Sequence, residues 1–97
     1  MLEKDFKISR NISEKIYKKH NVIEEEVYEC FLNRDGSLLK DSRLNHRTDP
    51  PTMWFIARTD HNRLLKIVFI EFSDGRYEIK TAYEPNEEEV KIYERYA

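Results

Sequence analysis

The stretch Arg63-Leu64-Leu65-Lys66-Ile67-Val68-Phe69-Ile70-Glu71-Phe72 is the densest apolar run of the chain. As an extended strand it would carry apolar side chains on both faces, which is typical of a central strand that is covered on both sides. The run is rich in β-branched and aromatic residues, and the hairpin-turn signal Asp74-Gly75 follows it at once. These features favour a strand over a helix. We therefore predict a central strand over residues 63–72, which contains the basic residues Arg63 and Lys66.

The segments beside this strand predict an antiparallel meander, because short turns connect them. Three further strands are expected, over residues 37–41, 52–59 and 76–83. In the last of them, simple alternation would place Tyr77, Ile79, Thr81 and Tyr83 on one face.

Two helices are predicted before the sheet and one after it. Ser9 is a suitable N-cap for a helix that ends at about His20. A second helix is expected over about Ile23–Leu32, with glutamates in its first turn. Asn86 and Glu89 have the spacing of a capping box, which predicts a last helix directly after Asn86.

Length and composition predict a single α+β domain over residues 1–97: a helical hairpin, a four-stranded antiparallel meander sheet and a C-terminal helix. An apolar content of 39% suffices for one core, and a charged content of 37% predicts a well-solvated exterior. No apolar run reaches membrane-spanning length and the chain opens on charged residues, so we expect a cytoplasmic protein with no membrane association. The single cysteine, Cys30, fits a reducing compartment.

The net charge of −2 conceals an alternating pattern of basic and acidic segments. The formal charge is +3 over residues 1–20, −4 over 21–35, +3 over 36–66 and −4 over 67–97. Overall acidity argues against a general nucleic-acid binder, but a local basic face remains compatible with it. Alternating solvated surface is the simpler explanation.

Several short motifs, in a specific order and spacing, carry a resemblance to a known family. They are Lys19-His20-Asn21-Val22, Glu25-Glu26-Val27, Cys30-Phe31, Asp41 with Arg43, Trp54-Phe55-Ile56-Ala57, the run 63–69, and Ile79, Thr81, Ala82, Glu89 and Tyr93. Over residues 11–95 the chain resembles BrnT-type toxins, small ribonucleases of bacterial toxin–antitoxin pairs with a RelE-like fold. The resemblance implies metal-independent cleavage of RNA and a small antitoxin as partner. The chain departs from the family in its acidity, in the insertion His46-Arg47-Thr48-Asp49-Pro50-Pro51, and in Tyr83, which stands where the family's terminal motif has an arginine.

Residues 46–57 and 81–89 are also similar to small bacterial proteins that carry the label ADP-ribosyl-(dinitrogen reductase) hydrolase. Proteins with that activity resemble large all-helical enzymes that hold two metals in an acidic cluster. The sequence supplies no such cluster, and its predicted sheet contradicts that fold. We therefore do not expect this activity.

Cleavage of RNA through the 2′-hydroxyl needs groups that transfer protons and cations that stabilise the phosphorane charge. Candidate catalytic residues are His46, Tyr83 and Arg43, and candidate phosphate-binding residues are Arg47, Arg58, Arg63 and Lys66. Tyr83 has a second candidate role as a stacking platform for a base. The alternative explanation is that these are ordinary loop charges and a tyrosine of the core. The alternative function is accordingly a non-catalytic protein- or RNA-binding module of the same fold.

The sequence gives little support for a phosphate site at Lys19 and His20, a metal or cofactor site, or a reactive cysteine. Lys19 and His20 at a helix end suggest either a phosphate contact or an interaction with the helix C-terminus, and the second is favoured. The chain has no Cys-x-x-Cys, no His-x-x-x-His and no glycine-rich loop, so we expect neither a metal nor a cofactor. Cys30 lies on the apolar side of its helix, which predicts a buried structural thiol.

Overall fold

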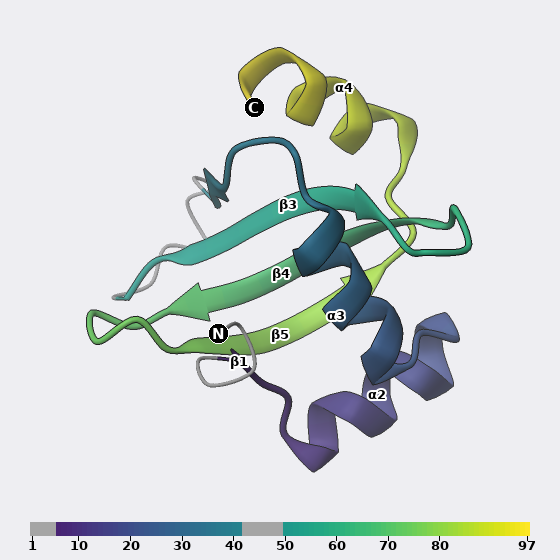
Figure 1. Cartoon of the computed structure of the whole chain (residues 1–97), viewed down its shortest axis with the longest axis vertical. Helices are drawn as coiled ribbons and strands as arrows, with labels where there is room; N and C mark the ends of the chain where they lie inside the picture. The colour runs from purple at the N-terminus through teal and green to yellow at the C-terminus, as the bar shows by residue number, and fades with distance from the viewer. Residues whose placement is uncertain (1–5, 42–49) are drawn as a thin grey trace.

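The computed structural model describes residues 6–41 and 50–97. Its elements in chain order are β1 (Phe6–Lys7), α2 (Arg10–His20), α3 (Glu24–Asn33), β2 (Leu39–Lys40), β3 (Thr52–Arg58), β4 (Leu64–Glu71), β5 (Tyr77–Tyr83) and α4 (Glu87–Tyr96). Strands β2 to β5 form the predicted four-stranded antiparallel meander. The short strand β1 adds a fifth strand, parallel to β5, at the edge of the sheet. The α+β prediction is confirmed (Figure 1). None of the helices in the described ranges is long and apolar enough to cross a bilayer.

Strand β4 lies at the centre of the sheet between β3 and β5, as its sequence predicts. On one face Leu65, Ile67 and Phe69 are fully buried. Helix α2 packs along β5 and helix α3 crosses β3 and β4 on this side (Figure 1). Phe31 of α3 joins the core through an edge contact with Phe55, with ring centroids 4.8 Å apart. The helical hairpin and the sheet therefore share one aromatic core.

Helices α2 and α4 begin at side-chain caps that the sequence predicts. The Ser9 Oγ accepts a hydrogen bond from the Ile12 N–H at 3.2 Å and begins α2. Asn21 ends α2 in the left-handed conformation, with φ 55°. At α4 the Asn86 Oδ1 accepts from the Glu89 N–H at 2.8 Å, and the Glu89 Oε1 accepts from the Asn86 N–H at 3.0 Å. The capping box predicted from the sequence is thus confirmed.

The pairing of β4 with β5 contains a register shift. Val68 lies opposite Thr81, whereas the next residue, Phe69, lies opposite Ile79. Lys80 is therefore an extra residue in β5 and has no partner in this register. An extra residue inverts the alternation of side chains beyond it.

This shift makes one sequence prediction wrong, namely that Tyr77, Ile79, Thr81 and Tyr83 share a face. Ile79 is fully buried, and the Tyr77 ring lies 5.0 Å from the Phe69 ring, so both lie on the side of α3. Thr81 and Tyr83 face the opposite side, because they follow the extra residue. The shift therefore brings Tyr83 onto the face that α4 covers.

Helix α4 packs beside β3 through Tyr93, which is buried. The Tyr93 ring lies 5.7 Å from the Trp54 ring, and its hydroxyl donates a hydrogen bond to the Ser37 carbonyl at 2.9 Å. A Cβ atom on Gly36 would lie only 2.5 Å from that hydroxyl. The position of α4 therefore depends on a residue without a side chain in the α3–β2 connection.

We predict that Gly36→Ala lowers the free energy of unfolding by about 1–3 kcal/mol, because overpacking displaces the Tyr93 hydroxyl. Urea unfolding followed by circular dichroism measures the change. The same substitution should cost less in a Tyr93→Phe background, where the closest clashing atom is absent. Equal costs in both backgrounds would show that the close approach does not matter.

Candidate functional site

Three polar side chains from three elements meet on the α4 side of the sheet, and we call them the polar cluster: Lys66 of β4, Tyr83 of β5 and Glu89 of α4. Lys66 and Tyr83 are register partners, so their side chains lie next to each other on this face. The Lys66 Nζ lies 2.8 Å from the Glu89 Oε2, and the Tyr83 hydroxyl donates to the same oxygen at 2.8 Å. The Lys66 side chain is only 8% exposed. One carboxylate oxygen thus joins a buried cation to a phenol.

The environment of the cluster keeps Glu89 ionised. Partial burial raises the pKa of Glu89, but hydrogen bonds from Lys66, Asn86 and Tyr83 outweigh burial and lower this pKa below its ordinary value. The Lys66 ammonium also lies 4.5 Å from the centre of the Trp54 ring, which stabilises the cation through the electrons of the ring. The cluster is therefore a charge-paired site in which each ionic group has a specific partner.

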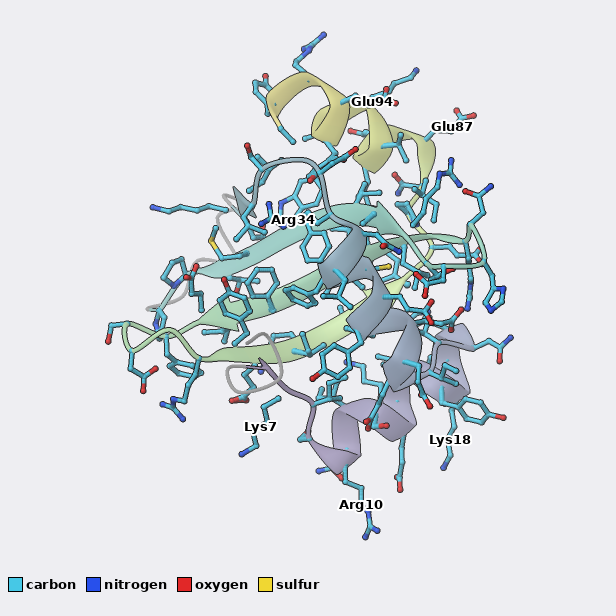
Figure 2. The ribbon with its side chains drawn as sticks, in the orientation of Figure 1. Lys7, Arg10, Lys18, Arg34, Glu87 and Glu94 are labelled. Atoms are coloured by element: carbon cyan, nitrogen blue, oxygen red, sulfur yellow. The ribbon has the colours of Figure 1, made fainter. Side chains whose placement is uncertain are left out.

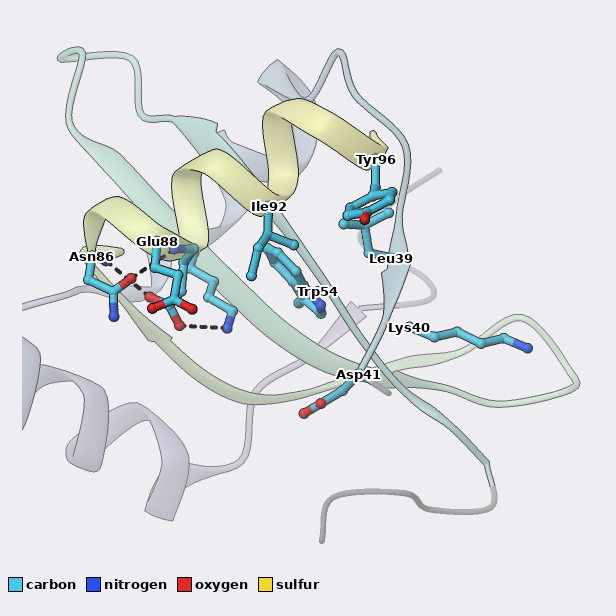
Figure 3. A pocket seen from close by; sticks show the side chains of 10 residues that line it. Leu39, Lys40, Asp41, Trp54, Asn86, Glu88, Ile92 and Tyr96 are labelled. Carbon is cyan, nitrogen blue, oxygen red and sulfur yellow. Dashed lines mark hydrogen bonds and ion pairs between the residues drawn. The ribbon is translucent and has the colours of Figure 1, made fainter. Parts of the chain in front are cut away.

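Two members of the cluster, Lys66 and Glu89, line a hollow of about 630 Å³ between α4, β2 and β3, which we call the α4 hollow. Its lining includes Lys66 and Glu89 from the cluster and Leu39, Trp54 and Ile92 as apolar members. Figure 3 shows Ile92 against Trp54, and the ring of Tyr96 beside Leu39. An apolar floor with a few polar groups is the usual composition of a ligand site.

Arg63 lies at the start of β4 and binds the ends of three other elements. Its guanidinium contacts both oxygens of Glu26 at 3.0 Å and the Glu84 Oε2 at 2.8 Å. It also donates to the carbonyls of His20 at 3.0 Å and Asn21 at 2.8 Å. Burial lowers the pKa of Arg63, and the bonds to the two carboxylates outweigh this and raise it. The donors of Arg63 are therefore directed at the protein itself.

The other predicted site residues fall in two groups. Arg58 is exposed and donates from its Nη1 to the Asn62 carbonyl at 3.0 Å, within the β3–β4 turn. It does not line the α4 hollow. Arg43, His46 and Arg47 lie outside the described residues. Of the predicted residues that the structure describes, Lys66 and Tyr83 meet in the polar cluster. Arg63 and Tyr83 also line one hollow, at the end of α2.

A second hollow, of about 650 Å³, lies at the C-terminal end of α2, and we call it the α2 hollow. Its lining residues are Lys18, Lys19, His20, Asn21, Arg63, Tyr83 and Glu84. The His20 ring lies 5.4 Å from the Tyr83 ring at an interplanar angle of 39°. Tyr83 therefore belongs both to this hollow and to the polar cluster.

Sequence reasoning missed several of these participants. The sequence identifies Glu89 as a capping residue and as part of the family resemblance, but not as a partner of Lys66 and Tyr83, because its second oxygen binds residues far away in the chain. Trp54 was not expected near a cation. Lys18 lies next to the residues Lys19 and His20 that the sequence singled out, and this basic run at a helix end was the available signal for the α2 hollow.

Cys30 is a buried structural thiol, as predicted. It is fully buried, and its Sγ lies 3.7 Å from the Ala57 carbonyl. Burial, together with the nearby charges of Glu26 and Glu29, raises its pKa to about 12. The thiol is therefore protonated at neutral pH and a poor nucleophile. Across residues 6–41 and 50–97, no three His, Cys, Asp or Glu side chains lie together as a metal site would require.

The chain matches no model of a known protein family, and no curated protein matches it either.

We predict that Arg63→Met lowers the free energy of unfolding by about 1–2 kcal/mol, because Glu26, Glu84 and two carbonyls lose their shared donor. This expected loss of unfolding free energy is smaller than for a fully buried ion pair, because the Glu84 side chain is 64% exposed. Denaturant unfolding checks this value. The control is Arg76→Met, which removes an exposed ion pair with Asp74 and should leave stability close to that of the wild type. Equal losses in the two variants would contradict the structural role of Arg63.

We predict that the polar cluster makes stability sensitive to acid. Because the folded pKa of Glu89 lies below its unfolded value, the contribution of Glu89 is fully present above the ordinary glutamate pKa of 4.5. It is lost as the pH falls from there through the lowered folded pKa. Unfolding free energies measured across this range should fall more steeply for the wild type than for Glu89→Gln. Parallel curves would show that the contacts of Glu89 do not stabilise the fold.

Proposed function

We propose that the chain is the toxin half of a bacterial type II toxin–antitoxin pair, of the BrnT type with a RelE-like fold. Its activity would be metal-independent cleavage of RNA in the cytoplasm, and its partner a small antitoxin protein. The sequence resemblance over residues 11–95 and the α+β fold support this proposal. The observation that carries it is the sharing of one Glu89 oxygen by Lys66 and Tyr83, beside the α4 hollow that Lys66 and Glu89 line.

The polar cluster has the groups that this reaction uses on its leaving-group side. In the reaction the 2′-oxygen attacks phosphorus, the bond from phosphorus to the 5′-oxygen breaks, and the products are a 2′,3′-cyclic phosphate and a 5′-hydroxyl. The Lys66 ammonium would stabilise the charge that develops on the phosphorane. The Tyr83 hydroxyl would protonate the leaving 5′-oxygen. Glu89 would orient both donors, and the proton of the 2′-hydroxyl is assigned to His46 on sequence grounds alone.

The burial of Lys66 supports a functional rather than a purely structural cluster. Holding a lysine and a glutamate out of water is costly, and apolar residues of similar size often stabilise such a site better. A purely structural cluster would serve only to attach α4 to the sheet. Tyr93 and Trp54 already supply apolar packing for that attachment. Glu89, a carboxylate with a lowered pKa beside a hollow, is a combination typical of functional sites.

A second candidate function is a non-catalytic protein- or RNA-binding module of the same fold. It is favoured by the pairing of both strand cations with carboxylates, Arg63 with Glu26 and Lys66 with Glu89. An RNA phosphate would have to compete with these carboxylates. Tyr83 in place of the family's arginine also removes a fixed cation from this region.

Incubation of the purified protein with single-stranded RNA and a chelator tests catalysis. We expect fragments that end in a 2′,3′-cyclic phosphate, with the rate reduced about 100-fold or more by Lys66→Met or Tyr83→Phe. Lys80→Met, on the exposed extra residue of β5, is the matched control and should cleave at the wild-type rate.

Unfolding curves of each variant separate a loss of chemistry from a loss of folding. RNA that stays intact with the folded wild type would refute the ribonuclease. If that protein still binds RNA or a small partner protein, the binding module is supported instead.

A further inference from the structure

The basic run at the end of α2 is not explained by helix capping. Cations near a helix C-terminus ordinarily interact with its last carbonyls. Here Arg63 already donates to the His20 and Asn21 carbonyls. Asn21, in the left-handed conformation, also directs its N–H to the Ile16 and Tyr17 carbonyls. Lys18 and Lys19 are therefore not needed as hydrogen-bond donors at this helix end, where exposed cations contribute only a weak attraction to the helix dipole.

The charges in the α2 hollow leave these two lysines uncompensated. Glu84 is the one acidic residue in the lining, and it is paired with Arg63. Within the described part of the chain, neither Lys18 nor Lys19 takes part in an ion pair. Both side chains are exposed, and Figure 2 shows Lys18 extending away from α2. The hollow thus presents two exposed cations, without ion-pair partners in the described part of the chain, to an anionic ligand.

Two aromatic rings lie next to these cations. His20 and Tyr83 pack at 5.4 Å with a tilt of 39°, and both line the hollow. The Tyr83 ring also lies 5.7 Å from the Lys66 ammonium. A ligand could therefore extend from the polar cluster, across Tyr83, to the lysines of α2. Cations that track a backbone beside rings that stack on bases are the usual features of a single-strand binding site.

We propose that the α2 hollow is a subsite for single-stranded RNA, in which Lys18 and Lys19 bind phosphate and the His20–Tyr83 ring pair receives an unpaired base. The inference rests on the proposed RNA-directed function and adds to it the form of RNA and the path of a flanking nucleotide. A duplex offers phosphate to the lysines but keeps its bases stacked internally. A purely acidic partner would likewise leave the rings unused.

The test measures binding of a labelled 2′-O-methyl oligonucleotide, which cannot be cleaved through a 2′-hydroxyl, by fluorescence anisotropy. The double substitution Lys18→Glu and Lys19→Glu should weaken binding about tenfold or more. It should also lower the slope of log affinity against log salt by about 1.4, because each single-strand phosphate contact contributes about 0.7. The matched control carries Lys15→Glu and Lys91→Glu, which change the net charge equally at exposed positions outside the hollow.

The variant His20→Ala and a comparison of single-stranded with duplex RNA test base stacking separately. His20→Ala should weaken binding about five- to tenfold with little change in the salt slope, because base stacking does not release counterions. A duplex of the same sequence should bind more weakly than the single strand. Unfolding curves establish that every variant is folded under the conditions of the assay.

Three results would overturn the subsite. Equal losses in the double variant and the charge-matched control would show that only net charge matters. Duplex binding as tight as that of the single strand, or no effect of His20→Ala, would exclude base stacking. In these cases RNA binding or cleavage by the wild type leaves the proposed function standing. If the folded wild type neither binds nor cleaves RNA, the proposed function fails and the subsite fails with it.

Discussion

The Arg63 guanidinium is the interaction on which the arrangement of this domain depends. It joins the end of α2, the start of α3 and the residue that follows β5, through two carboxylates and two carbonyls. Because Arg63 immediately precedes the central strand, the helical hairpin is attached to the sheet at the point where β4 begins. The same attachment brings His20 next to Tyr83. A single polar side chain thereby determines which surface the end of α2 shares with the sheet.

Lys66 has the corresponding role on the other face. It lies three positions after Arg63, and alternation along the strand directs the two cations to opposite sides of the sheet. Arg63 contacts the hairpin of α2 and α3, whereas Lys66 contacts α4 through Glu89. Glu89 uses its two oxygens for different tasks, since Oε1 begins the helix and Oε2 binds the sheet. The start of α4 and its attachment are therefore coupled through one carboxylate.

Features that depend on residues close together in the sequence could be predicted, whereas contacts between residues far apart in the chain could not. The caps at Ser9 and Asn86 join residues three positions apart, and the central strand follows from its own composition, so a local pattern suffices for both. One partner of Arg63 is Glu26, 37 residues earlier. The sequence does not indicate which distant carboxylate a given arginine pairs with. The extra residue Lys80 has no glycine or proline to mark it, so the reversal of faces in β5 was not predictable from alternation. The predicted fold class is still correct, because the order in which strands pair depends on the turns. The candidate site is more sensitive to the error, because it depends on which face of the sheet each side chain occupies.

Tyr83 links the two candidate sites, and its chemistry differs from that of an arginine. A phenol donates one hydrogen bond and offers a flat ring, but at neutral pH it contributes no positive charge. An anionic ligand at this position must therefore obtain its cations from neighbours. Lys66 is committed to Glu89 and Arg63 to Glu26 and Glu84, so among the lining residues of the α2 hollow the unpaired lysines are Lys18 and Lys19. An acidic chain with a net charge of −2 can thus still present a local cationic surface, because its carboxylates neutralise the strand cations and leave those of α2 exposed. Any affinity for RNA should then depend on a short helical segment rather than on the charge of the whole protein.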